Sequence, residues 1–147
     1  MKRLTNYSNG ERLTLELPGL PTSANAIWRS CVAARGRKVY SYRSEEYRAW
    51  LRRVEAEILA RGVRIPDDWP FVGVELILTP PNRRDVDVDN RFKALFDALT
   101  AARFWRDDSL VADVRASLTE PIKGGRTLVY FERRETKYQK YPALETE

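Results

Sequence analysis

The side chains best able to do chemistry stand in an acidic run between positions 83 and 93. Three aspartates there alternate with single residues, namely Asp85, Asp87 and Asp89. Alternate residues of an extended segment point the same way, so neighbouring carboxylates would lie roughly 6–7 Å apart. Two unit charges at about 6 Å repel by roughly 3 kcal/mol at an effective dielectric of about 20. Such a concentration of charge needs compensation, which we expect from nearby arginines and from a bound metal ion.

A second acidic pair, Asp107 and Asp108, stands further along the chain. We expect it to close on the first run, so that both segments hold divalent metal ions against a nucleic-acid phosphate. Each segment also has a purely structural interpretation. Asp87 or Asp89 could cap a following helix, and residues 107–109 could form an ordinary turn before a strand. A cap needs one acid, however, whereas three alternate in the first run.

The composition limits which metal and which chemistry are available. The chain has no histidine and one cysteine, which excludes a Ser-His-Asp triad, an imidazole general base and a Cys/His zinc site. Carboxylate, amide and water oxygens suit Mg²⁺, Mn²⁺ or Ca²⁺ instead. An EF-hand loop beginning at Asp85 would need a glycine at position 90 and a glutamate at position 96, where this sequence has Asn90 and Phe96. Both required residues are absent, so Mg²⁺ working on substrate phosphates is the prediction.

Lys93 lies one helical turn after Asp89, so the two side chains share a face of the expected helix. An exposed ion pair worth about half a kcal/mol would be the structural interpretation. The functional interpretation places the Lys93 ammonium beside the metal-bound phosphate. Asp97 follows one turn later and could instead hold Lys93 in place.

The overall charge favours an anionic partner such as nucleic acid. The chain carries 26 Lys and Arg against 21 Asp and Glu, a net charge of +5, and its pI is near 9.5. A basic soluble protein of another kind would share this charge. A patch at Arg35-Gly36-Arg37-Lys38 is interpreted either as a solvated loop or as a contact to the phosphate backbone. Cys31 has no partner for a disulfide, and no apolar run approaches a membrane span, so we expect a cytoplasmic protein with no membrane contact.

The hydrophobic pattern predicts the elements that position these residues. The length of 147 residues corresponds to one domain, spanning 1–132 and followed by a polar, flexible tail over 133–147. Strands are expected over 12–17, 71–79, 110–118 and 127–131. The last two are expected to form a hairpin across Lys123-Gly124-Gly125-Arg126. A loop over 21–30 carries Asn25 and Trp28. One helix is capped by Ser44 and ends at Gly62, and a second begins near Asp89. We therefore predict an α+β fold with a mixed sheet of about four strands and two helices packed on it.

With these residues in view, the sequence resembles the RusA family of Holliday-junction resolving endonucleases. The resemblance spans nearly the whole chain to about Glu132. It is carried by Pro21-Thr22-Ser23-Ala24-Asn25, Arg84, Asp87-Val88-Asp89-Asn90, Lys93-Ala94-Leu95-Phe96-Asp97-Ala98-Leu99-Thr100, Phe104-Trp105-Arg106-Asp107-Asp108 and Lys123-Gly124-Gly125-Arg126. The run Asp-x-Asp-Asn-x-x-Lys with a downstream Trp-x-Asp-Asp is a fairly specific signature, although no single part of it is. Asp85 and Val86 depart from the family, which tends to be basic at these positions.

The resemblance implies a homodimeric, Mg²⁺-dependent nuclease of bacterial or phage origin that makes paired nicks in four-way DNA junctions. Asp87, Asp89 and Asp108 would bind the metal, for which Mn²⁺ is a possible substitute, and Lys93 would be the catalytic lysine. Asn90 and Asp107 would support them. Candidates for DNA contact are Asn25, Arg35, Arg37, Lys38, Arg83, Arg84, Lys123 and Arg126.

The expected mechanism is hydrolysis by a metal-activated water, which removes the need for a histidine base and leaves a 5′-phosphate. The metal and Lys93 would stabilise the charge that grows on the phosphate. Three alternatives stay open: a metal nuclease for other branched DNA such as flaps or forks, a non-catalytic DNA-binding protein whose acids serve as caps, and an interaction protein with no nucleic-acid role.

Overall fold

The structure, a computed structural model, describes residues 11–32 and 39–138. The loop that holds Arg35, Arg37 and Lys38 lies outside these residues. The elements are β1 (Arg12–Pro18), η1 (Ala24–Ala26), β2 (Trp28–Val32), β3 (Val39–Arg43), α1 (Glu45–Arg61), β4 (Phe71–Thr79), η2 (Asp89–Arg91), α2 (Phe92–Ala101), η3 (Asp108–Leu110), β5 (Val111–Leu118) and β6 (Arg126–Arg134), where η denotes a single 3₁₀ turn.

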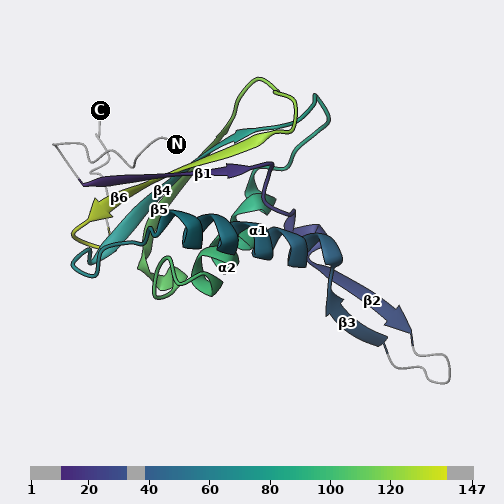
Figure 1. Ribbon diagram of the computed structural model, residues 1–147, viewed down its shortest axis with the longest axis horizontal. Coiled ribbons are helices and arrows are strands. Elements are labelled where there is room, and N and C mark those ends of the chain that lie inside the picture. The colour runs from purple at the N-terminus through teal and green to yellow at the C-terminus, as the bar shows by residue number, and fades with distance from the viewer. Residues whose placement is uncertain (1–10, 33–38, 139–147) are drawn as a thin grey trace, which may run out of the picture.

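Four strands form one mixed sheet in the order β1-β6-β4-β5, with two helices against it (Figure 1). Strand β6 runs antiparallel to both of its neighbours, whereas β4 and β5 are parallel. The predicted α+β fold with about four strands and two helices is confirmed. Among the described residues, neither helix is long and apolar enough to cross a membrane.

The predicted hairpin between the last two strands is wrong, because β5 and β6 pair with opposite edges of β4. The reason lies in the segment that joins them. The Thr119 amide donates to the Leu78 carbonyl and the Ile122 amide donates to the Pro80 carbonyl, so the chain stays bound to the end of β4 as it passes around it. The turn at Gly125, where φ is +69°, then delivers β6 to the far edge.

Helix α1 begins and ends where the sequence predicts. The Ser44 hydroxyl oxygen accepts a hydrogen bond from the Tyr47 amide at 3.1 Å, and Gly62 adopts a left-handed conformation with φ of 61°. The helix buries one apolar face, which consists of Tyr47, Trp50, Val54 and Ile58. The Trp50 indole N–H donates to the Ala94 carbonyl at 3.3 Å, which joins α1 to α2.

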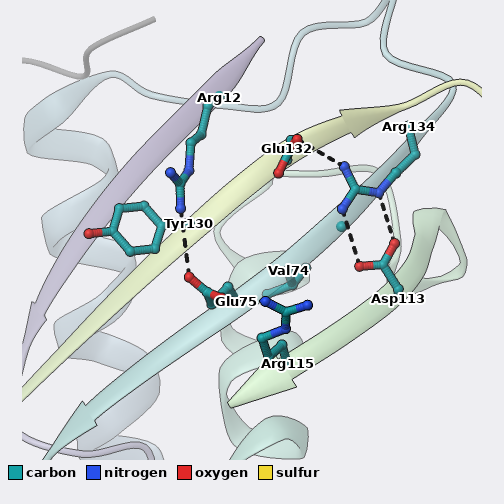
Figure 2. A pocket seen from close by; sticks show the side chains of 9 residues that line it. Arg12, Val74, Glu75, Asp113, Arg115, Tyr130, Glu132 and Arg134 are labelled. Carbon is teal, nitrogen blue, oxygen red and sulfur yellow. Dashed lines mark hydrogen bonds and ion pairs between the residues drawn. The ribbon is translucent and has the colours of Figure 1, made fainter. Parts of the chain in front are cut away.

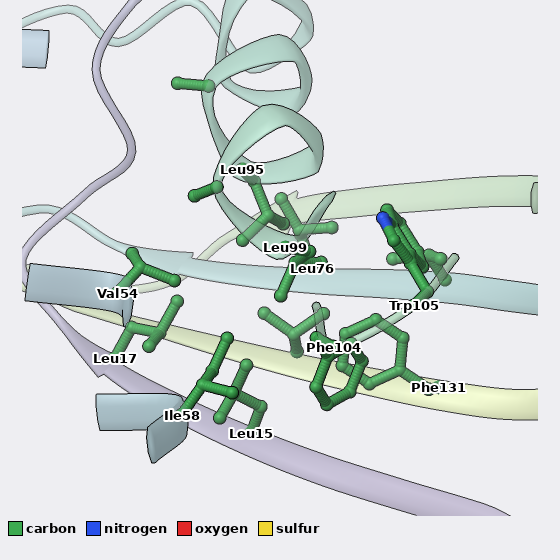
Figure 3. Packing of buried hydrophobic residues seen from close by; sticks show 14 of the residues in the cluster. Leu15, Leu17, Val54, Ile58, Leu76, Leu95, Leu99, Phe104, Trp105 and Phe131 are labelled. Atoms are coloured by element: carbon green, nitrogen blue, oxygen red, sulfur yellow. The ribbon is translucent and has the colours of Figure 1, made fainter. Parts of the chain in front are cut away.

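The hydrophobic core lies between the helices and one face of the sheet (Figure 3). Strands contribute Leu15, Leu17, Leu76 and Phe131, and the helices contribute residues such as Val54, Ile58, Leu95 and Leu99. Phe104 and Trp105, from the connection between α2 and β5, pack edge-on to each other with centroids 6.4 Å apart. The Phe104 ring also lies 4.7 Å from that of Phe131. Each of these large side chains stabilises the fold by about 1.5–3 kcal/mol through burial, so the connection before Asp107 is firmly anchored.

The opposite face of the sheet carries charges instead of a second layer of helices (Figure 2). The Arg134 guanidinium reaches across β4 to the Asp113 carboxylate at 2.9 Å. It crosses above Gly73, where an added Cβ would stand 2.6 Å from the Arg134 Nη2 atom. Glycine at this position therefore makes room for the ion pair that links β6 to β5.

Strands β2 and β3 form a separate antiparallel hairpin, here called the arm, which extends away from the body (Figure 1). Its strand β2 is exposed along its whole length. The predicted loop over 21–30 is therefore wrong from Trp28 onward. A strand exposed on both faces needs no alternation of apolar and polar residues, which is why the sequence pattern does not reveal it.

The last strand extends beyond the predicted domain boundary. Strand β6 ends at Arg134, so Arg133 and Arg134 belong to the sheet and not to the tail. The Arg133 amide donates to the Glu11 carbonyl at 2.9 Å, which holds this end of β6 against the beginning of β1. Residues 139–147 of the predicted tail lie outside the described part of the chain.

Candidate functional site

The acidic run presents its carboxylates to solvent. Asp85, Asp87 and Asp89 are exposed, whereas the intervening Val86 and Val88 are half-buried. Val88 packs against the hydrophobic core, which fixes the direction in which its neighbours point. Exposure alternates along the run as expected, but the backbone is not a strand: Val88 is already helical, with φ of −66° and ψ of −45°, and Asp89 opens η2.

The two acids that could have capped a helix do not do so. Helix α2 begins after Arg91, whose side chain makes no capping hydrogen bond, and η2 begins after Val88. The Asp87 Oδ2 atom instead accepts a hydrogen bond from the side-chain Nδ2 atom of Asn90 at 3.2 Å. Asn90 thus contacts Asp87, and its supporting role at a metal site stays a prediction.

Both members of the second acidic pair are exposed, but Asp107 also caps a turn. Asp107 caps η3, because its carboxylate accepts a hydrogen bond from the Ser109 amide. That backbone hydrogen bond is the main reason why the pKa of Asp107 is lowered from its ordinary value. The turn interpretation thus holds for Asp107, which leaves the adjacent and exposed Asp108 as the better candidate ligand.

Lys93 and Asp108 open onto the same hollow, which has a volume of about 520 Å³. Its wall runs along α2 through Asp97 and Thr100, and the root of the arm closes it with Trp28. Asp87 and Asp89 do not line this hollow; they stand just before the first turn of α2.

The parallel pairing of β4 with β5 separates the two acidic segments. The acidic run follows the last residue of β4, whereas Asp108 precedes the first residue of β5. Since the register pairs Val72 with Val111, the start of β5 lies beside the start of β4, not beside its end. The 10 residues of α2 return the chain over about 15 Å between these two ends.

The donor atoms suit a hard cation, but one chain does not gather three of them. No three acidic side chains come together as a metal-binding group within residues 11–32 and 39–138. Mg²⁺ is usually held by one or two carboxylates, with substrate phosphates and water completing its shell. Asp87, Asp89 and Asp108 fit such a site by their chemistry and exposure, and their closing on one ion stays a prediction.

Lys93 is held by a short network that connects both helices. Its Nζ atom donates to the Asp97 Oδ2 atom at 3.3 Å, and the Tyr47 hydroxyl donates to the same oxygen at 2.8 Å. Tyr47 is fully buried in α1. Burial, followed by the hydrogen bond to Asp97, raises the pKa of Tyr47 to about 12, so the hydroxyl stays protonated and keeps donating. The pairing of Lys93 with Asp97 follows from helical spacing, but the contribution of Tyr47 does not.

The predicted basic residues that the structure describes are exposed, and some already hold a carboxylate. Arg83 pairs with Glu120 at 2.5 Å, and Arg126 lies 3.6 Å from Glu16. Exposed pairs of this kind contribute about 0–1 kcal/mol, so a phosphate can compete for either arginine. Three further candidates are exposed, namely Asn25, Arg84 and Lys123.

Arg91, which the sequence does not single out, ties the acidic run to the segment that precedes η1. Its guanidinium donates to the Pro21 carbonyl at 2.7 Å. Burial lowers the pKa of Arg91, and the nearby carboxylates of Glu46 and Asp87 oppose that effect. The half-buried Arg91 guanidinium therefore balances part of the negative charge of the acidic run.

Comparison with known proteins identifies the family of the chain. The family model described as Endodeoxyribonuclease RusA matches residues 18–133. The chain is 37% identical over 107 residues to the crossover junction endodeoxyribonuclease of Enterobacteria phage 82, covering 72% of this chain and 82% of that protein. The crossover junction endodeoxyribonucleases RusA of Escherichia coli K12 and of Shigella sonnei match with the same identity and coverage. The chain therefore belongs to the Endodeoxyribonuclease RusA family.

Proposed function

We propose that this protein is an endodeoxyribonuclease that resolves four-way DNA junctions with the help of a divalent cation. The observation that carries the proposal is the shared hollow, in which Lys93 is held by Asp97 and stands together with the exposed Asp108. Family membership supplies the reaction class, since the relatives are named crossover junction endodeoxyribonucleases.

The proposed metal ligands are Asp87, Asp89 and Asp108, with Mg²⁺ as the natural cation and Mn²⁺ as a substitute. When bound, the cation supplies an activated water and charge stabilisation at the phosphate. Asn90 orients the Asp87 carboxylate through its hydrogen bond. Asp107 holds the turn that presents Asp108, through the Ser109 amide.

Lys93 is the proposed catalytic residue at the scissile phosphate, where its ammonium stabilises the growing negative charge. A lysine side chain is flexible, so its ammonium must be held in place to act at one phosphate oxygen. Asp97 provides that restraint directly, and the buried Tyr47 fixes the orientation of Asp97. Asp97 and Tyr47 are accordingly positioning residues.

A homodimer suits this reaction, because a two-fold axis would present two equal sites to the two strands that must be cut. The exposed basic residues would contact the phosphate backbone. If about six phosphates are neutralised, the slope of log affinity against log salt should be near −5 for duplex arms. Action on DNA supports a cytoplasmic location in a bacterial cell as part of this proposal, whether the gene is chromosomal or phage-borne.

The test is incubation with a synthetic four-way junction, a flap and a plain duplex, each with and without Mg²⁺. The proposal predicts paired, symmetric nicks with 5′-phosphate ends in the junction alone, and only when Mg²⁺ is present. Faster cutting of the flap would instead indicate a nuclease for other branched DNA. Tight junction binding without Mg²⁺-triggered nicks would indicate a non-catalytic DNA-binding protein.

A further inference from the structure

One tryptophan differs from the others in its environment. Trp50, Trp69 and Trp105 are 1%, 4% and 3% exposed and belong to the core. Trp28 is 53% exposed, although it is the first residue of β2 and follows the buried Ile27. A half-exposed indole presents an apolar face together with a polar N–H group, which suits it to contact a ligand.

The position of Trp28 is fixed at the root of the arm. The Ser44 amide donates to the Ile27 carbonyl at 2.8 Å, and the Ser44 hydroxyl donates to the Ala26 carbonyl at 2.5 Å. Ser44 also caps α1, so the first residue of the arm is tied to the helix that carries Tyr47. Trp28 therefore keeps its place relative to Lys93, in contrast to residues further along the arm, which have no such anchor among the described hydrogen bonds.

Trp28 lines the same hollow as Lys93 and Asp108. Its partner across the hairpin is Arg43, which lines that hollow as well. The Arg43 guanidinium also lies 5.5 Å from the centre of the Tyr47 ring. An exposed aromatic face, an arginine and an ammonium thus border one space, together with the carboxylates of Asp97, Asp107 and Asp108.

The charge of the surrounding segment favours nucleic acid as the occupant of that space. Between Glu16 and Glu45 the sequence has no acidic residue and contains five basic ones, which are Arg29, Arg35, Arg37, Lys38 and Arg43. The arm and its connections are thus cationic throughout. Anionic strands are attracted to such a segment, whereas a second, equally cationic arm would be repelled.

We propose that Trp28 is a stacking platform for an unpaired nucleobase next to the phosphate that Lys93 contacts. Every base has a π-face, so an indole accepts any of them, and the basic flanks hold the strand while the base stacks. This inference rests on the proposed action on DNA. It adds that the site takes a base out of the duplex stack, and not the sugar-phosphate backbone alone.

Tyr42 provides a matched control on the same hairpin. It is 47% exposed, similar to Trp28, but side chains alternate along a strand, so Tyr42 lies on the face opposite to Arg43 and its partner Trp28. It is also absent from the residues that line the hollow. The variants to compare are therefore Trp28→Ala, Trp28→Phe and Tyr42→Ala, with the fold of each checked by circular dichroism.

The experiment follows tryptophan emission while a chelator prevents cleavage and the salt concentration is fixed. Single-stranded oligonucleotide and four-way junction are each added to the full chain. We expect quenching in the wild type and in Tyr42→Ala, and its loss in Trp28→Phe. The affinity of Trp28→Ala for the junction should fall by about 5- to 150-fold, the range of one base–aromatic stack, while Trp28→Phe retains most of it.

Unchanged emission together with unchanged affinity of Trp28→Ala would overturn the platform. An emission change that depends on protein concentration in the absence of DNA would overturn it too, because a second copy would then be covering Trp28. Junction nicking by the wild type is scored separately. Nicking with neither quenching nor an affinity loss in Trp28→Ala rejects the platform and leaves the proposed function. Quenching and an affinity loss without nicking would reject the proposed function and leave the stacking of a base on Trp28.

Discussion

The Lys93 ammonium and the Asp97 carboxylate lie one turn apart on α2, with the Lys93 Nζ atom 3.3 Å from the Asp97 Oδ2 atom. The same oxygen accepts the Tyr47 hydroxyl at 2.8 Å, so α1 and α2 together determine where the ammonium stands. The Lys93 side chain remains 60% exposed, which leaves it accessible to a phosphate. An exposed pair of this kind adds little to stability, so its importance under the proposed function is to position the ammonium.

Replacing Asp97 should lower turnover without removing binding. In Asp97→Asn the charged acceptor is lost while the shape is kept, so the ammonium is no longer held at one position. We expect the rate of junction nicking under saturating conditions to fall roughly tenfold to a hundredfold, with the affinity for the junction unchanged. Tyr47→Phe should give a smaller fall in rate, because Asp97 still contacts Lys93. Equal rates in Asp97→Asn and the wild type would contradict the positioning role.

Tyr47 should make the fold sensitive to alkaline pH. Its pKa is raised to about 12, so the unfolded chain releases the tyrosine proton at lower pH than the folded chain. The unfolded state then binds fewer protons between about pH 10 and pH 12, and the free energy of unfolding falls as pH rises through that window. Its full contribution is present below about pH 10, and roughly 2–3 kcal/mol is lost by about pH 12.

Urea unfolding of the wild type and of Tyr47→Phe at a series of alkaline pH values would measure this loss. The variant removes only the contribution of Tyr47 to the pH dependence of the free energy of unfolding, because the other tyrosines titrate in both proteins. We expect the wild type to lose more stability than the variant as pH rises. Parallel curves would show that Tyr47 titrates alike in the folded and unfolded chains.

Gly73 should matter because of the ion pair that crosses it. In Gly73→Ala the new Cβ would stand 2.6 Å from the Arg134 Nη2 atom and 2.9 Å from an Asp113 carboxylate oxygen. The side chains must separate, and we expect a loss of about 1 kcal/mol in the free energy of unfolding. A double-mutant cycle with Arg134→Ala checks the cause. In the Arg134→Ala background, Gly73→Ala should change the free energy of unfolding very little. If the losses from the two substitutions simply add, the strain does not come from the contact with Arg134.

Lys93 should act on turnover and not on metal binding. Lys93→Ala removes the ammonium but none of the carboxylates, so we expect nicking to fall by about a hundredfold or more while Mn²⁺ affinity, measured by calorimetry, persists. Lys123→Ala is the matched control, because Lys123 is exposed and lies in a turn far along the chain. It should weaken junction binding slightly and reduce the salt slope by about 1. A change in metal affinity alone in Lys93→Ala would refute its role at the phosphate.

The parts of the fold that the sequence predicts well are those set by local signals. Ser44 and Gly62 bound α1 because capping and a left-handed glycine depend on residues within one turn. The pairing of β6 was not predictable from Gly124 and Gly125, since the hydrogen bonds of Thr119 and Ile122 to the end of β4 decide it. Backbone hydrogen bonds of this kind do not depend on residue type, so the sequence carries no pattern that predicts them.

The site divides in the same way. Spacing along α2 is enough to predict that Lys93 and Asp97 share a face. Nothing in the spacing places Tyr47 beside Asp97, which is 50 residues away, or Trp28 beside Lys93. The separation of Asp87 from Asp108 follows from the parallel pairing of β4 and β5, which depends on the whole sheet.

The central claim is that the acidic run does chemistry at a DNA phosphate, and junction nicking by Asp87→Asn tests it most directly. Asp87 and Asp85 are both exposed aspartates of the same run, but only Asp87 is oriented by Asn90. Removing one negative charge should not weaken binding to DNA. We predict that Asp87→Asn binds the junction and fails to nick it, while Asp85→Asn nicks at nearly the native rate. Native nicking by Asp87→Asn would contradict the account.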